Sequence, residues 1–223
     1  MTLIKPYKFL PKEDIENHAQ NLLVQVQSRR NRQIKNYDIA EAVADYLDLY
    51  IEWTSLEPDE LGIIAAMIIP SEQKILINEN ILELPNIKFS KVSSDGFKNS
   101  TIAHEIGHWM LHINYNTISK YQDRTGNSLS NNSAPFLCRS LNSLEKIEWQ
   151  AQYFASCLLM PKNKLIETMK GRDLGKKSHF AAMAEDLGVT VSNLRVRLKG
   201  LDWITYDQKS QKIYPKKNFN NEC

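Results

Sequence analysis

The sequence predicts an α+β fold in which helices pack on a small mixed or antiparallel β-sheet, followed by a C-terminal helical subdomain. Three observations favour this fold. Apolar residues recur at helical spacing in several segments, short apolar runs lie between residues 50 and 78, and two short helical segments follow residue 178. The chain has 223 residues, 42% hydrophobic and 24% charged, which is typical of a globular protein. We expect residues 1–170 to form the core and residues 171–223 to form the subdomain packed on it.

The N-terminal part of the chain predicts two helices and then three strands. Apolar periodicity indicates one helix after Pro11 and a second over residues 37–49. Strands are predicted at residues 50–54, 62–69 and 74–78. The last two are separated by only four residues, so we expect them to form a hairpin. An edge strand of this hairpin can bind an extended peptide by strand addition.

A third helix is predicted over residues 101–113, after an irregular approach over residues 84–98. Asn99 and Ser100 are residue types that cap helix N-termini, and the segment after them contains no proline. Its apolar residues recur at helical spacing and are expected to face the core: Ile102, Ile106, Trp109 and Ile113.

This third helix carries an H-E-x-x-H motif at residues 104–108. His104 and His108 are four residues apart, so they share one helix face and can bind one Zn²⁺. Glu105 lies beside the first histidine, where it can take a proton from a water activated by the metal. Gly107 is a poor helix former, which indicates close packing against the backbone that carries a third ligand.

The third ligand must come from another segment. The metzincin extension of the motif is absent, because Leu111 and Asn114 stand where its glycine and third histidine would be. His112 lies eight residues after His104, about 12 Å along a helix axis, which is too far for one tetrahedral zinc to bind both. We therefore interpret His112 as a packed or hydrogen-bonded neighbour of the site.

A fourth helix, predicted over residues 142–160, offers two acidic candidates. Asn142 and Glu145 form an N-x-x-E capping pair, which gives Glu145 a structural role at the helix start. Glu148 lies one turn further, beside an apolar stripe, where an unpaired carboxylate would be costly. We therefore favour Glu148 over Glu145 as the third ligand. Residues 116–140, rich in loop signals, join the two helices.

Two sequence blocks resemble one family, the ImmA/IrrE-type zinc metallopeptidases. The blocks are T-I-A-H-E-I-G-H-W-M-L-H at residues 101–112 and I-E-W-Q-A-Q-Y-F-A-S-C-L-L-M-P at residues 147–161. The resemblance implies a zincin-like fold. It makes His104, His108 and Glu148 zinc ligands and Glu105 the general base. It also implies that the substrate is a helix-turn-helix transcriptional repressor, cleaved in a stress or mobile-element response. Gln152 departs from the family's usual asparagine, which affects only local packing.

The C-terminal subdomain provides the alternative function. Residues 179–187 and 191–198 have the outline of a helix-turn-helix, with Arg195, Arg197 and Lys199 on the second helix. The alternative is thus a DNA-binding or repressor-sequestering regulatory protein with a non-catalytic zinc site. We expect no direct DNA binding, because the basic residues are few and the net charge is only +2. A structural zinc site usually has four ligands and is rich in cysteine, whereas only three ligands are found here.

The remaining features bear on cellular location. The N-terminus lacks the apolar region of a signal peptide, and no apolar run approaches the length of a membrane span. The three cysteines have no spacing that suggests a disulfide framework. We therefore expect a cytoplasmic protein that binds no membrane.

Overall fold

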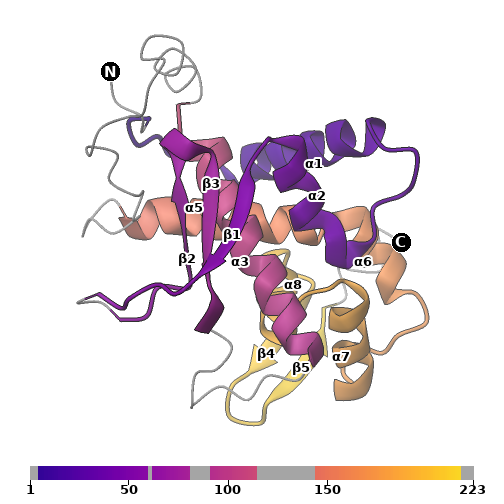
Figure 1. Ribbon diagram of the computed structural model, residues 1–223. Coiled ribbons are helices and arrows are strands. Elements are labelled where there is room, and N and C mark those ends of the chain that lie inside the picture. The colour runs from indigo at the N-terminus through magenta and orange to yellow at the C-terminus, as the bar shows by residue number, and fades with distance from the viewer. Residues whose placement is uncertain (1–4, 60–61, 81–90, 115–143, 217–223) are drawn as a thin grey trace.

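The structure is a computed structural model that describes residues 5–59, 62–80, 91–114 and 144–216. It has the predicted α+β architecture, with helices packed on a small mixed sheet (Figure 1). The helices are α1 (Lys12–Ser28), α2 (Ile39–Tyr46), α3 (Lys91–His112), α5 (Leu144–Leu159), α6 (Lys162–Met169), α7 (Lys177–Asp186) and α8 (Val191–Gly200). The strands are β1 (Tyr50–Thr54), β2 (Ala66–Ile69), β3 (Lys74–Asn78), β4 (Ile204–Asp207) and β5 (Lys212–Pro215).

The three-stranded sheet has the order β1-β3-β2, so β1 and β2 are its edges. Strand β1 runs parallel to β3, and β2 runs antiparallel to β3, as the predicted hairpin requires. A 3₁₀ turn over Pro70–Glu72 joins β2 to β3, and Gln73 closes it with a left-handed φ of 50°. The strand predicted over residues 62–69 is shorter in the structure, where β2 begins at Ala66. Gly62 pairs with Asp59 in an isolated bridge.

Helices α3 and α5 cross at the centre of the molecule, and α3 also packs against β2 and β3 (Figure 1). The predicted apolar stripes of both helices are buried: Ile102, Ile106, Trp109 and Ile113 on α3, and Ile147, Ala151, Phe154 and Leu158 on α5. Helix α1 covers α5 from the side away from the sheet. The central crossing therefore holds the H-E-x-x-H helix rigidly against its partner.

Helix α3 begins at Lys91, so the prediction of an irregular approach up to Lys98 is wrong for residues 91–98. Asn99 and Ser100 lie inside the helix and are not its N-caps. The side chain of Asn99 is buried and donates to the carbonyl oxygen of Gly188 over 3.1 Å. Ser100 donates back to the carbonyl of Gly96, which lets a hydroxyl residue sit within a helix. A tertiary contact thus satisfies the Asn99 amide, and the preceding turn of α3 satisfies the Ser100 hydroxyl.

Residues 116–140 and the capping pair of Asn142 with the Glu145 side chain lie outside the described residues. Within the described ranges, no helix combines the length and the apolar character needed to cross a bilayer.

The C-terminal part contains the two predicted short helices, α7 and α8, and a two-stranded sheet, β4-β5, that the sequence analysis missed (Figure 1). The proposed boundary at residue 170 falls between α6 and α7. Thr190 caps α8 by accepting a hydrogen bond from the backbone N–H of Asn193. Leu194 and Leu198 are fully buried, so the inner face of α8 is used for packing.

Arg197, a candidate for DNA contact, is also buried, with 2% of its surface exposed. Its guanidinium donates to Glu16 of α1 over 2.7 Å and to the carbonyl oxygen of Met160 over 3.2 Å. Arg195, the other arginine of this helix, is partly exposed and lies over the ring of Tyr206. Arg197 therefore ties α8 to the core and has no free face to offer to a phosphate.

Candidate metal centre

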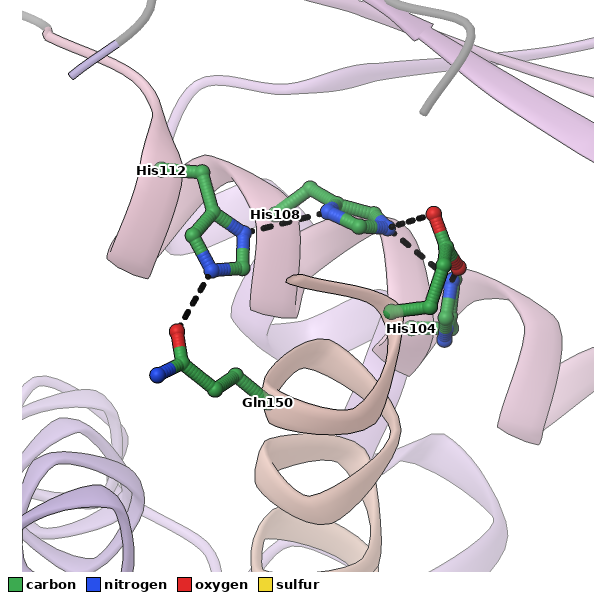
Figure 2. Close-up of polar contacts among 5 residues, drawn as sticks. His104, His108, His112 and Gln150 are labelled. Atoms are coloured by element: carbon green, nitrogen blue, oxygen red, sulfur yellow. Dashed lines mark hydrogen bonds and ion pairs between the residues drawn. The ribbon is translucent and has the colours of Figure 1, made fainter. Parts of the chain in front are cut away.

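Helix α3 places His104 and His108 on one face, one turn apart. Their ring centroids are 4.6 Å apart and their Nε2 atoms are 3.0 Å apart. His108 is almost fully buried, whereas one fifth of the His104 side chain is exposed. The two Nε2 atoms therefore converge on a point at the edge of the core (Figure 2).

Helix α5 brings a carboxylate to the same point. One oxygen of Glu148 lies 2.9 Å from Nε2 of His104, and the other lies 3.5 Å from Nε2 of His108. One ligand atom from each of the three side chains lies within 4.8 Å of the other two. The Glu148 side chain is 37% exposed, so this side of the group is open to solvent. Glu145 belongs to the same helix, but its side chain lies outside the described residues.

Gly107 explains how the two helices come close enough. A Cβ atom at this position would lie 2.8 Å from the backbone oxygen of Ala151 and 3.0 Å from its Cα. Only glycine permits that approach, because real Cβ atoms essentially never come so close to other atoms. Ala151 is on α5, less than one turn after Glu148. The prediction that Gly107 packs closely against another backbone is confirmed: the backbone is that of α5, the helix that carries Glu148.

The hydrogen bonds and charges of the three side chains shift one another's pKa values. Burial lowers the pKa of His108 to about 4, which keeps its imidazole neutral at physiological pH. Burial alone would raise the pKa of Glu148, but the two imidazoles hold the pKa of this carboxyl well below its usual range. Burial also opposes the charge on His104, yet the adjacent Glu148 raises the pKa of His104 overall. The group thus keeps one carboxylate ionised beside one neutral imidazole.

Glu105 lies next to His104 on α3 and is 7% exposed. Burial raises the pKa of its carboxyl from 4.5 to about 7, and the neighbouring charge of Glu148 raises it as well, while His104 acts in the opposite direction. A carboxyl with a pKa near neutrality can both accept and return a proton at physiological pH. Glu105 can therefore accept a proton at neutral pH, next to His104 in the chain.

His112 lies behind His108, on the side away from Glu148. The Nδ1 atoms of His108 and His112 are 3.1 Å apart, and Nε2 of His112 is 3.0 Å from the side-chain oxygen of Gln150 on α5 (Figure 2). The interpretation of His112 as a hydrogen-bonded neighbour is confirmed. The sequence analysis missed Gln150, because no motif marks a buried glutamine that faces a different helix. By contrast, Nδ1 of His104 has no hydrogen-bond partner in the part of the chain described.

The donor set suits zinc. Two imidazole nitrogens and one carboxylate oxygen form a common ligand set of catalytic zinc sites, which leave a fourth position for water or substrate. The solvent-exposed side of Glu148 provides access to such a position. Among the described residues, His104, His108 and Glu148 are the group of three whose ligand atoms come close enough to hold a metal ion.

Comparison with known proteins agrees with this site. A peptidase family model, the IrrE N-terminal-like domain, matches residues 85–199, a span that includes α3, α5 and both short C-terminal helices. No curated protein matches the chain. The α+β arrangement is consistent with the zincin-like fold expected for this family. Because the matched span covers more than half of the 223 residues, the chain belongs to the peptidase family of the IrrE N-terminal-like domain.

Proposed function

We propose that the protein is a zinc-dependent endopeptidase. The observation that supports this most directly is the convergence of His104, His108 and Glu148, whose ligand atoms lie within 4.8 Å of one another beside the buried carboxyl of Glu105. Membership of a peptidase family points to the same reaction class. In this proposal the three converging residues are the metal ligands, and Glu105 is catalytic.

In hydrolysis, the metal ligands and Glu105 have different roles. Zinc, when bound, acts as a Lewis acid that lowers the pKa of water and polarises a carbonyl oxygen. His108 offers an unprotonated nitrogen because burial keeps it neutral, and Glu148 offers a negative oxygen. Glu105 takes a proton from the attacking water on a carboxylate oxygen and delivers it to the nitrogen of the departing amine. Burial raises the pKa of this carboxyl to about 7 in the metal-free protein, and a bound cation favours its ionised form, which accepts the proton.

The proposed substrate is a helix-turn-helix transcriptional repressor, as the family resemblance implies. The edge strand β2 supports a protein substrate, because it packs beside α3 and pairs with β3 on one side only within the described sheet. An extended segment of the substrate can add to this edge through backbone hydrogen bonds. Cleavage of the repressor would then relieve repression of stress or mobile-element genes.

The experiment compares wild type with Glu105→Gln. Both proteins are assayed for zinc content and incubated with a repressor encoded beside the gene, and the fragments are identified by mass. We expect both to bind roughly one zinc per chain. We expect only wild type to cleave at a substantial rate, since loss of a general base lowers rates by about 10²–10⁴-fold. Equal cleavage by both proteins would contradict the role of Glu105.

The ligands are tested by separate alanine substitutions. His104→Ala, His108→Ala and Glu148→Ala should each lower zinc affinity strongly, whereas Glu145→Ala serves as the control on the same helix and should retain the metal. Full loading of Glu148→Ala together with loss of zinc from Glu145→Ala would reverse the choice of ligand. Tight repressor binding without cleavage by wild type would instead favour a protein that sequesters its partner.

A further inference from the structure

A continuous line of polar contacts runs from the N-terminal segment to the metal centre. The side-chain amide nitrogen of Gln150 donates to the backbone oxygen of Lys8 over 3.0 Å. The amide oxygen of Gln150 lies 3.0 Å from Nε2 of His112, and Nδ1 of His112 lies 3.1 Å from Nδ1 of His108 (Figure 2). His112, His108 and Gln150 are all buried, so water does not compete for the contacts among these three side chains.

The backbone carbonyl of Lys8, at the end of this line away from the metal centre, sets the direction of every hydrogen bond in it. A backbone carbonyl can only accept, so the Gln150 amide must turn its NH₂ toward Lys8 and its oxygen toward His112. That oxygen also only accepts, so Nε2 of His112 carries a hydrogen. A neutral His112 then has a lone pair at Nδ1, and the close nitrogen of His108 must donate to it. His108 is therefore protonated at Nδ1 and bears its lone pair at Nε2, the atom that faces His104 and Glu148.

The opposite direction fails on the same geometry. It would require His112 to donate from Nδ1 and to accept at Nε2, which needs the NH₂ of Gln150 on that side. The amide oxygen would then face the carbonyl oxygen of Lys8 at about the same 3.0 Å separation, with no hydrogen between them. The buried amide oxygen of Gln150 would then lack a donor, and an unsatisfied buried group costs about 1–3 kcal/mol.

We propose that His112 and Gln150 are positioning residues that hold His108 in the tautomer able to bind a metal through Nε2. This inference rests on the proposed metal site. It adds an explanation of why the ring hydrogen of His108 lies on Nδ1 and leaves Nε2 free for the metal. A hydrogen bond to the outer nitrogen of a metal-binding histidine fixes its ring and raises its basicity. For His108 the partner at the outer nitrogen is His112. Nδ1 of His104 has no such partner among the described residues.

The N-terminal segment is part of this support. The backbone N–H of Lys5 donates to the carbonyl oxygen of His112 over 2.8 Å, and the Lys5 ammonium group donates to that of Met110. Lys5 and Lys8 thus contact the end of α3 and the middle of α5 at once. Both residues precede the span 85–199 matched by the family model, so this support comes from a part of the chain outside the matched domain.

The first test measures zinc affinity by competition with a chromophoric chelator. His112→Leu removes the acceptor and should weaken zinc binding about 10–100-fold. His112→Asn returns an oxygen near the position of Nδ1 and should recover most of that loss. The control is His179→Leu, because Nδ1 of His179 likewise accepts a hydrogen bond, from the backbone N–H of Asp173, but lies on α7. It should leave the affinity unchanged.

The second test reads the tautomer directly by nitrogen-15 NMR of the histidine rings in the metal-free protein. Wild type should show His108 protonated at Nδ1 and bare at Nε2. Gln150→Met, which is close in length and cannot accept from His112, should give a mixture of the two tautomers. This spectrum decides the inference even if His112→Leu does not fold, because wild type and Gln150→Met are enough for it.

The outcomes separate this inference from the proposed function. Failure of wild type to bind zinc would defeat the metal site itself. Tight zinc binding by wild type with equal affinity in His112→Leu, or a wild-type spectrum with His108 protonated at Nε2, would overturn the positioning role alone. Loss of affinity in both His112→Leu and His112→Asn, with the wild-type tautomer retained in Gln150→Met, would also overturn it in favour of simple packing.

Discussion

In the metal-free protein, Glu105→Gln should unfold with a higher free energy than wild type, and this difference should grow as the pH rises. Glu105 is 7% exposed, and burial raises the pKa of its carboxyl from 4.5 to about 7. A carboxyl whose pKa is higher in the folded state contributes its full stability below the unfolded pKa and loses it as the pH rises through the folded pKa. Glutamine has the same shape and no charge, so Glu105→Gln avoids this loss.

The size of the effect follows from the two pKa values. A rise from 4.5 to about 7 corresponds to roughly 3 kcal/mol, since each pKa unit is worth about 1.4 kcal/mol. Little of this appears near pH 5, and nearly all of it appears by about pH 8. The free energy of unfolding of Glu105→Gln should therefore exceed that of wild type by an amount that grows by roughly 2–3 kcal/mol across this range.

The assay is urea unfolding of both proteins after treatment with a chelator, at several pH values between about 5 and 8. The acid sensitivity that arises from His108, whose pKa burial lowers to about 4, is present in both proteins and largely cancels in the difference. Zinc-loaded samples provide the control, because a nearby cation favours the ionised carboxyl and should shrink the pH dependence. A difference that stays constant with pH in the metal-free proteins would refute the reasoning.

Two further predictions concern the contacts that hold the site together. Gly107→Ala should lower the stability of the fold by about 1–3 kcal/mol and weaken zinc binding, because its Cβ would meet the backbone of α5 at 2.8 Å. Gly200→Ala, with open space around the added Cβ, should do neither, and equal thermal stability of the two variants would contradict this explanation. Arg197→Met should cost about 1–3 kcal/mol in urea unfolding, because it removes the guanidinium partner of the partly buried Glu16, which keeps only Lys162. Arg195→Ala removes a partly exposed arginine of the same helix and should change stability little. A mobility shift with operator DNA that is lost in Arg195→Ala would revive DNA binding.

The sequence alone determined the parts of the protein that depend on local spacing. The four-residue spacing of His104 and His108 places both imidazoles on one face of any helix, whatever surrounds it. The apolar stripes of α3 and α5 follow from the same periodicity, and they are buried as expected. The close packing at Gly107 could be predicted because glycine is unfavourable within a helix, and the close approach of α5 explains its presence there.

Local signals failed where tertiary contacts satisfy the same polar groups. Asn99 and Ser100 are typical of a helix start, yet α3 continues through both of them from Lys91. The carbonyl oxygen of Gly188, far along the chain, satisfies the buried Asn99 amide, and a neighbouring turn of the helix satisfies Ser100. A capping preference is worth only about 1 kcal/mol, so contacts of this kind override it.

Only the tertiary structure decided which distant groups meet. The basic character of Arg197 suggested a nucleic-acid contact, but its partner Glu16 lies 181 residues away and buries it. The line from Lys8 through Gln150 and His112 to His108 joins the N-terminal segment, α5 and α3, and no spacing within one segment encodes it. Such contacts depend on how helices cross, because side chains far apart in sequence become neighbours only when packing fixes the distance between their backbones.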